Sequence, residues 1–279
     1  MKTIYSILVA ILLLAPAAMS FRQVQPGSTK ITLMAAGKNI QPADLQRTAT
    51  VITGRLSDYF HSTPEVKINN DRNQVEIAVP GKQDSSVILS LTTSKGAAGF
   101  FETAGRNELV SILPAASSVF PLLTAYDEKN RPEVIGTISA NDQYRCIEIL
   151  EKMEKSGKVE FAWHNSEGGM KSLYALKCGA GGNAAVTGKD IQTAVCKDDR
   201  ILITLRKDAV KAWSELTGRA LGRSVALTLD GEVIFAPKVM DRITGGKIEV
   251  TGKFDRNELM FISSILNNGE LPVKLVAAR

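Results

Sequence analysis

The chain has 279 residues, of which 44% are hydrophobic and 23% are charged, and this composition predicts a globular protein of about two domains. The formal net charge is +5, but the basic residues are scattered rather than clustered, so the charge pattern does not indicate a nucleic-acid partner. The chain has two histidines, and its three cysteines lack the spacing of a metal knuckle, so the sequence predicts no metal site.

The first twenty residues have the pattern of a cleavable signal peptide. Lys2 is a minimal basic region, and the apolar run from Ile4 to Leu14 is shorter than the roughly 20 residues that a membrane span needs. Small residues then stand at both specificity positions of residues 15–17 and of residues 18–20. We therefore expect residues 1–20 to be a signal peptide, cleaved near residue 18 or 21, and the mature chain to lie in the periplasm. A retained membrane anchor is the alternative.

Residues 21–104 are predicted to form a ferredoxin-like base. Apolar residues recur at helical spacing after Pro42, and proline suits the first position of a helix because its missing N–H would be unpaired there anyway. The expected elements are a strand at 30–35, a helix from Pro42, strands at 65–69 and 74–79, a helix at 84–94 and a strand at 99–103. The order strand, helix, strand, strand, helix, strand is the ferredoxin-like arrangement.

The rest of the chain divides into a connecting region, 105–169, and a head, 170–279. The connecting region carries one helix and one strand, at 142–156 and 159–163. Asp230-Gly231 has the residues of a tight hairpin turn. The head is expected to contain strands at 172–177, 201–206, 224–229, 232–235 and 247–251, a helix around Trp213, a helix from Asp255 to Gly269 and a closing strand at 273–277. The predicted fold class is therefore α+β, with an antiparallel head that carries two to three helices.

No motif in the chain indicates an enzyme. The Gly-rich stretch CGAGGNAAVTGKD (178–190) lacks phosphate-loop spacing, and Asp190 replaces the hydroxyl residue that should follow Lys189. No Gly-x-Ser-x-Gly elbow is present, and His61 and His164 stand in positions typical of a loop and a strand end. The sequence therefore predicts no catalytic residue, no nucleotide site and no cofactor, and it favours a protein that binds or scaffolds.

The three cysteines are expected to divide into one pair and one free thiol. Cys146 faces the apolar stripe of its helix, where a buried free thiol is the usual case. Cys178 follows one strand and Cys196 precedes a turn, so neighbouring strands can bring these two together. A Cys178–Cys196 disulfide is the prediction, with three free thiols as the open alternative.

The segment ELTGRALGRSVALTLDGEVIFAPKVMDRITGGKIEVTGKFDRNELMFISSILNNGELPVKL (215–275) resembles the head subdomain in the first periplasmic domain of SecD and fused SecDF proteins. AVTGKDIQTA (185–194) is similar to the start of that head, and IAVPGKQD (77–84) to a motif of its base, with GFFET (99–103) similar to the next strand. FAWHNSEGGMKSLYALK (161–177) most resembles the fused proteins. The resemblance covers most of residues 30–276 and is most specific in the last hundred.

The resemblance implies a ferredoxin-like base, in agreement with the strand order, and a head that captures translocating polypeptide outside the membrane while it moves relative to the base. The fused proteins couple this capture to the proton gradient through twelve membrane helices, and this sequence has none of them. We therefore expect a periplasmic polypeptide-binding module, chaperone-like or accessory to secretion, without its own proton-coupling machinery. Its expected partners are non-native or translocating polypeptide and a membrane secretion complex.

Two alternatives remain at this point: a structural domain that docks on an envelope complex without binding clients, and a hydrolase with an unrecognised site. For the binding face the sequence indicates Phe235, Val239, Met240 and Ile243, because FAPKVMDRI has no clean alternation and exposed apolar groups often mark interaction sites. A loop packed on the core is the other interpretation. Gly269 and Pro272 in NNGELP are the expected hinge between base and head, the alternative being an ordinary helix end.

Overall fold

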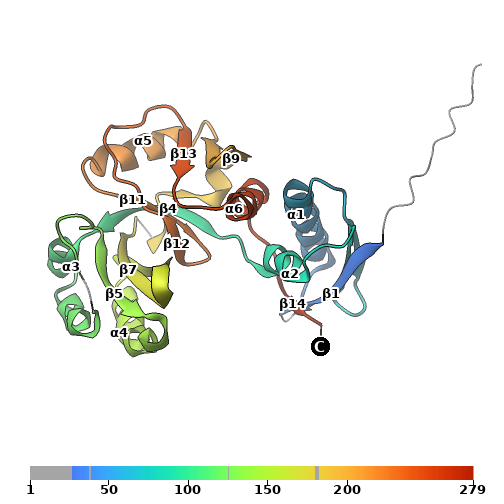
Figure 1. Ribbon diagram of the computed structural model, residues 1–279, viewed down its shortest axis with the longest axis horizontal. Coiled ribbons are helices and arrows are strands. Elements are labelled where there is room, and N and C mark those ends of the chain that lie inside the picture. Colours follow the sequence, from blue (N-terminus) through green and yellow to red (C-terminus); the bar gives the residue numbers. More distant parts are fainter. Residues whose placement is uncertain (1–26, 38, 125, 180–181, 279) are drawn as a thin grey trace, which may run out of the picture.

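The computed structural model describes residues 27–278, apart from residues 38, 125, 180 and 181. Figure 1 shows a small base at one end, built around β1 (Ser28–Ala36) and α1 (Pro42–Phe60), and a larger head at the other. The predicted signal peptide lies outside the described residues. Within the described part of the chain, no helix combines the length and the apolar character that a membrane span requires.

The base is a four-stranded antiparallel sheet against which two helices pack. Its strand order is β14-β1-β3-β2, the order of a ferredoxin-like sheet. Alternate side chains of β3 are buried in one core with the apolar side of α1, which has the predicted helical spacing. The remaining elements are β2 (Glu65–Asn69), β3 (Gln74–Pro80), α2 (Ser85–Thr93) and β14 (Lys274–Ala277).

The fourth strand of the base is β14, and the prediction that placed the strand at 99–103 there was wrong. β1 pairs with β14 in the register Leu33↔Ala277, whereas β4 (Ala98–Ala104) pairs with β11 and β7 in the head. All seven residues of β4 are buried, which suits the middle of a sheet covered on both faces. The base therefore consists of two chain segments, and the head is inserted between α2 and β14.

The head contains a mixed seven-stranded sheet in the order β5-β7-β6-β12-β11-β4-β8. Because β4 also pairs with β7, the five strands β7-β6-β12-β11-β4 close into a ring. A separate apolar cluster takes at least one side chain from each ring strand, as in a filled small barrel: Phe101, Ala162, Tyr174, Leu176, Ala226 and Val233. The strands other than β4 are β5 (Val134–Ser139), β6 (Val159–Ser166), β7 (Met170–Lys177), β8 (Val186–Thr187), β11 (Val225–Leu229) and β12 (Glu232–Phe235).

Residues 105–169 are part of the head and not a connecting region, so this boundary also needs correction. β5 and β6 lie on either side of β7 in the large sheet. A second apolar core, which includes Ile138, Leu150 and Leu173, joins these strands to the helices of the same segment. The helical elements are α3 (Arg106–Ile112), the 3-10 segment η1 (Pro114–Leu122) and α4 (Tyr144–Glu154).

The head also contains a three-stranded antiparallel sheet in the order β13-β10-β9. α6 packs against β9 in the head and against α1 in the base, so it lies between the two parts (Figure 1). The predicted capping box of Asp255 and Glu258 is present at its start. The elements are β9 (Ile191–Lys197), β10 (Arg200–Leu205), α5 (Val210–Arg219), β13 (Lys247–Thr251) and α6 (Arg256–Asn268). These sheets and helices confirm the α+β class, although β12 and β6 pair in parallel, so the head is not antiparallel throughout as predicted.

The expected Cys178–Cys196 disulfide is absent, because the two residues lie in different sheets. Cys178 directly follows β7 of the seven-stranded sheet, and Cys196 lies in β9 of the three-stranded sheet. All three thiols are free, and Cys146 is buried in α4 as expected. Burial raises the pKa of Cys178, and the neighbouring charges of Glu160 and Glu154 raise it further.

We expect non-reducing peptide mapping of the folded protein to find three free thiols. The thiolate is the reactive form, so the raised pKa of Cys178 should make its alkylation by iodoacetamide at pH 8 slower than that of a thiol in an unfolded peptide. Cys146, which is buried, should react only after unfolding in urea. A Cys178–Cys196 peptide in the map would contradict this arrangement of the sheets.

Candidate functional site

The four residues predicted for the binding face line one cavity of about 430 Å³ in the head. This groove runs between β13 and β11, above α5, and the loop at 236–246 forms its outer wall. Its lining is mainly apolar and comes from both sheets: Phe100, Trp213, Val225, Leu227, Phe235, Pro237, Val239, Met240, Ile243, Ile248 and Val250.

Two buried aromatic rings, of Phe100 and Trp213, line the groove. The rings of Phe100 and Trp213 meet edge to face, with centroids 5.2 Å apart and an angle of 71° between the planes. Trp213 is 3% exposed, yet its indole N–H has no hydrogen-bond partner among the described residues. A buried indole N–H normally finds an acceptor, so the N–H of Trp213 is an exception among buried donors.

The four predicted residues differ in burial. Val239 is 7% exposed and belongs to the core, Met240 is 75% exposed, and Phe235 and Ile243 are half-buried. The loop that carries them is held at both ends, because the backbone N–H of Val239 donates to Arg223 O and that of Ile243 to Thr217 Oγ1. Of the predicted set, Met240 is therefore the most exposed apolar side chain at the groove.

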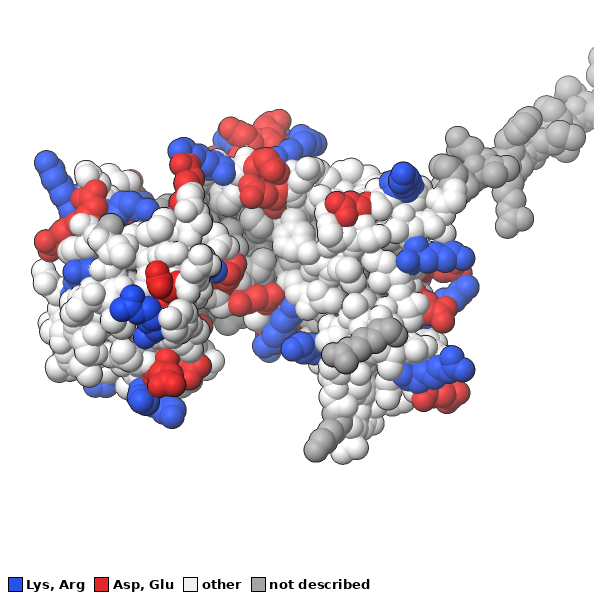
Figure 2. Space-filling view, turned by 60° about the horizontal axis from the view of Figure 1, so that its bottom comes forward, with Lys and Arg blue, Asp and Glu red and all other residues white. Residues whose placement is uncertain are grey.

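The rim of the groove carries charges of both signs. Lys238 and Lys247 line it together with Asp241 and Glu249. Figure 2 shows the same mixture over a whole face of the molecule, where acidic and basic side chains alternate without a broad patch of either sign. The groove therefore offers shape and apolar surface without a strong preference for the charge of a ligand.

The predicted hinge residues lie at the neck, where the chain passes between base and head twice. Gly269, with φ of 74°, caps α6 on the return crossing, and Pro272 is exposed three residues later. The outgoing crossing, residues 94–97, lies against the return crossing, because Leu271 N donates to Lys95 O over 2.8 Å. The sequence pattern missed this outgoing half of the neck.

Arg55 of α1 joins the two crossings. Its side chain is fully buried and donates from Nη1 to Leu91 O and Ser94 O, at 2.9 and 2.7 Å. From Nη2 it donates to Lys95 O and Gly269 O, at 3.1 and 2.5 Å. Burial lowers the pKa of Arg55 to about 10 and the charge of Asp230 opposes this shift, so the guanidinium remains charged at neutral pH.

The head touches the outgoing crossing through the turn between β11 and β12. Asp230 Oδ1 accepts from Ala97 N over 2.8 Å, and its Oδ2 accepts from Ser94 Oγ over 2.5 Å. Asp230 N in turn donates to Ala97 O. Asp230 and Gly231 have φ of 52° and 82°, as the predicted hairpin turn requires. The sequence analysis assigned Asp230 only to a hairpin turn, and the structure shows that it also attaches the head to the neck.

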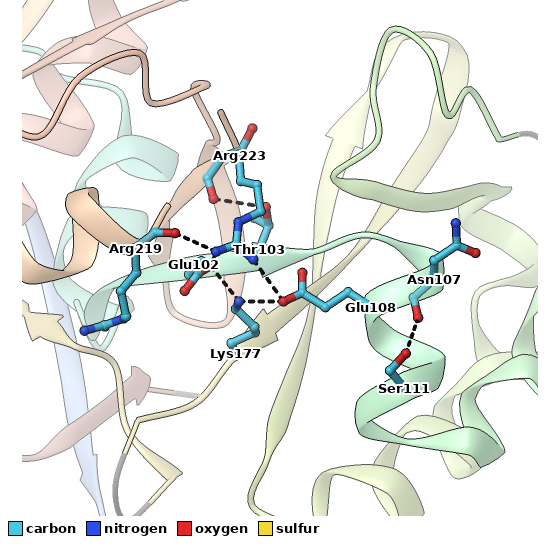
Figure 3. A network of polar contacts seen from close by, with 9 residues as sticks. Glu102, Thr103, Asn107, Glu108, Ser111, Lys177, Arg219 and Arg223 are labelled. Atoms are coloured by element: carbon cyan, nitrogen blue, oxygen red, sulfur yellow. Dashed lines mark hydrogen bonds and ion pairs between the residues drawn. The ribbon is translucent and has the colours of Figure 1, made fainter. Parts of the chain in front are cut away.

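Four charged residues close the ring of strands where β4 meets β7 (Figure 3). Lys177 Nζ lies 2.5 Å from Glu102 Oε1 and 2.7 Å from Glu108 Oε1, and Arg223 contacts the same two carboxylates. The residues come from β4, α3, β7 and the segment before β11, so the cluster joins elements that are far apart in the sequence. Each carboxylate is paired with two cations, which indicates a structural contact and not a catalytic pair.

Residues 171–273 match the family model of the SecDF P1 head subdomain. The translocase subunit SecD of Acidaminococcus fermentans is 37% identical over 99 residues, which are 34% of this chain and 24% of that protein. SecD of Petrotoga mobilis is 25% identical over 237 residues, covering 81% of this chain and 44% of that protein. The chain thus spans less than half the length of these curated relatives.

Two solved SecDF structures share the fold. One, of a membrane component that enhances protein export, has a TM-score of 0.54 at 21% identity and covers 90% of this chain and 98% of its own. The other, a super-membrane-facing form, has a TM-score of 0.57 at 20% identity and covers 95% of this chain and 32% of its own. The family-model match and the sequence relatives confirm the predicted resemblance to SecD and SecDF, and the two solved structures show that the fold is shared.

The Arg55→Met variant should lose at least about 3 kcal/mol of unfolding free energy, because four carbonyl groups at the neck lose the guanidinium as a donor. Trypsin should also cleave it faster after Lys95, in the outgoing crossing. Urea unfolding and timed digestion measure the two effects. Arg47→Met is the matched control on the same helix, since its side chain is 70% exposed and the change should cost no more than about 0.5 kcal/mol. Equal midpoints for the two variants would refute the role assigned to Arg55.

Proposed function

We propose that this chain is a periplasmic polypeptide-binding module that acts in, or accessory to, protein translocation. The role in translocation rests on the match to the SecDF P1 head subdomain. The binding of polypeptide rests on one observation above all: the residues selected from the sequence for exposed apolar character line a single apolar groove with mixed rim charges. The charged residues beside the apolar side chains of an unfolded polypeptide vary from one segment to the next. A groove with an apolar lining and rim charges of both signs is suited to such a ligand.

The proposal is non-enzymatic. The charged cluster at the ring closure supports this view, since Glu102 and Glu108 are each paired with Lys177 and Arg223. Carboxylates engaged by two cations in this way serve to join the elements that carry them. The proton-coupled step of translocation would fall to a membrane secretion complex as partner.

The Met240→Ser variant should bind unfolded polypeptide about ten-fold more weakly while its stability stays within about 0.5 kcal/mol of wild type, because Met240 is exposed and contributes apolar area only to a ligand. Binding of fluorescently labelled, reduced and carboxymethylated α-lactalbumin, followed by anisotropy, measures the first effect, and urea unfolding measures the second.

Val195→Ser is the matched control for Met240→Ser. Val195 is 54% exposed on β9, outside the groove, so its change should leave binding unaltered. Wild-type protein that fails to bind the unfolded chain would favour the alternative of a structural docking domain. Equal losses in the two variants would show that general surface hydrophobicity, and not the groove, holds the ligand.

The same proposal includes export by a cleavable signal peptide. Mass measurement of the chain from a periplasmic fraction should give an N-terminus near residue 18 or 21, because both positions follow small residues at the cleavage site. An intact Met1 in the membrane fraction would contradict periplasmic release.

A further inference from the structure

The groove borders the backbone edge of β13 and not just one face of its sheet. Lys247, Ile248, Glu249 and Val250 all line the cavity, although successive side chains of a strand point to opposite faces. Four consecutive residues can line one cavity only if that cavity lies alongside the strand. In the part of the chain that the structure describes, β13 pairs with β10 alone, so it is an edge strand.

The hydrogen-bond register fixes which backbone groups of β13 face the groove. Leu205 N donates to Gly246 O, and the ladder continues through the pairs Ile203↔Ile248 and Ile201↔Val250. In an antiparallel pair, alternate residues direct both N–H and C=O toward the partner strand. Ile248 and Val250 therefore bond to β10, and the N–H and C=O of Glu249 face away from it, toward the groove side.

We propose that the groove binds its polypeptide by strand addition: an extended segment pairs with the free edge of β13 through Glu249 and inserts alternate apolar side chains toward Trp213 and Phe100. This inference rests on the proposed polypeptide binding and specifies its mode. The occupant is an extended polypeptide because a strand edge recognises a backbone, and the apolar lining accepts side chains at every second position.

The charges around the edge fit a ligand of unrestricted sequence. Lys247 and Glu249 on β13, with Lys238 and Asp241 on the opposite wall, give two cations and two anions. Binding therefore draws on main-chain hydrogen bonds and apolar contact, both of which any chain with a short apolar stretch supplies. β13 contains no proline, and the charged Lys247 and Glu249 on the edge would hinder uncontrolled pairing.

The probe is the peptide acetyl-KTVTVTVTK-amide, labelled with fluorescein on its first lysine, and two versions of it. One version carries N-methyl groups on its three valines. The other carries them on the last three of its four threonines. Alternate residues place their N–H groups on the same edge, so the two versions block opposite edges of an extended peptide. On wild-type protein, one version should bind at least ten-fold more weakly than the other. Equal binding of the two versions, whether weakened or not, overturns strand addition.

Glu249→Pro removes the outward N–H, and an edge strand tolerates proline where its N–H faces away from the sheet. This variant should bind the unmethylated peptide at least ten-fold more weakly. Glu249→Ala is the matched control: it also loses the exposed ion pair with Arg200 but keeps the N–H, and should bind within two-fold of wild type. Equal affinities in the two folded variants overturn the proposal, and if the proline variant does not fold, the methylated peptides on wild type decide.

The outcomes separate this inference from the proposed function. Unmethylated peptide that binds and is weakened by Met240→Ser, with no difference between the methylated versions, leaves the groove as the site and rejects strand addition. No binding of the unmethylated peptide rejects both. A second copy of the chain is the other possible occupant of the edge, and a dimer in sedimentation that Glu249→Pro dissociates and the peptide does not would also overturn the proposal.

Discussion

The buried guanidinium of Arg55 sets how the base and the head are joined. The guanidinium donates hydrogen bonds to carbonyl groups of both neck segments. These are Ser94 O and Lys95 O where the chain leaves the base, and Gly269 O where it returns. A buried cation without acceptors is destabilising by several kcal/mol, so the position of the two crossings and the presence of Arg55 depend on each other. Gly96 completes the constraint, because a Cβ there would lie 2.1 Å from Arg55 Nη2.

The neck and the groove are connected through one hairpin. The turn of β11 and β12 binds the outgoing crossing through Asp230, and the flanking strands line the groove with Leu227 and Phe235. Meanwhile α6 packs on the base and on β9, and its last turn is tied to α1 where Asn267 and Asn268 donate to Asp58. A rotation at Gly269 would therefore have to separate α6 from α1.

The sequence predicted local structure well and chain-distant pairing badly, for physical reasons. The spacing of α1, the Asp230-Gly231 turn and the capping box of α6 are decided by residues a few positions apart. The choice between β4 and β14 as the last strand of the base depends on distant partners, such as Leu33 and Ala277, which are 244 residues apart, and alternation alone cannot select them. The predicted Cys178–Cys196 disulfide was wrong for the same reason, since two strands that are close in the sequence do not have to lie in the same sheet.

Part of the candidate site was also predictable from local sequence and part was not. The loop residues from Phe235 to Ile243 were recognisable because apolar groups without alternation do not fit a simple strand, and they do line one groove. Arg55 and the free edge of β13 left no such signal in the sequence. A buried arginine on a helix has the same sequence context as a solvent-exposed one, and the sequence of a strand does not show which of its edges is unpaired.

The free edge that makes the groove a candidate site is therefore visible only in the sheet topology. The ring is closed by paired charges at β4 and β7. The sheet beside it ends at β13, whose outer edge has no partner strand among the described residues and has apolar side chains around it. The charges of Lys247 and Glu249 protect this edge from uncontrolled pairing, and in the proposed strand addition an extended polypeptide would supply the strand that the edge lacks.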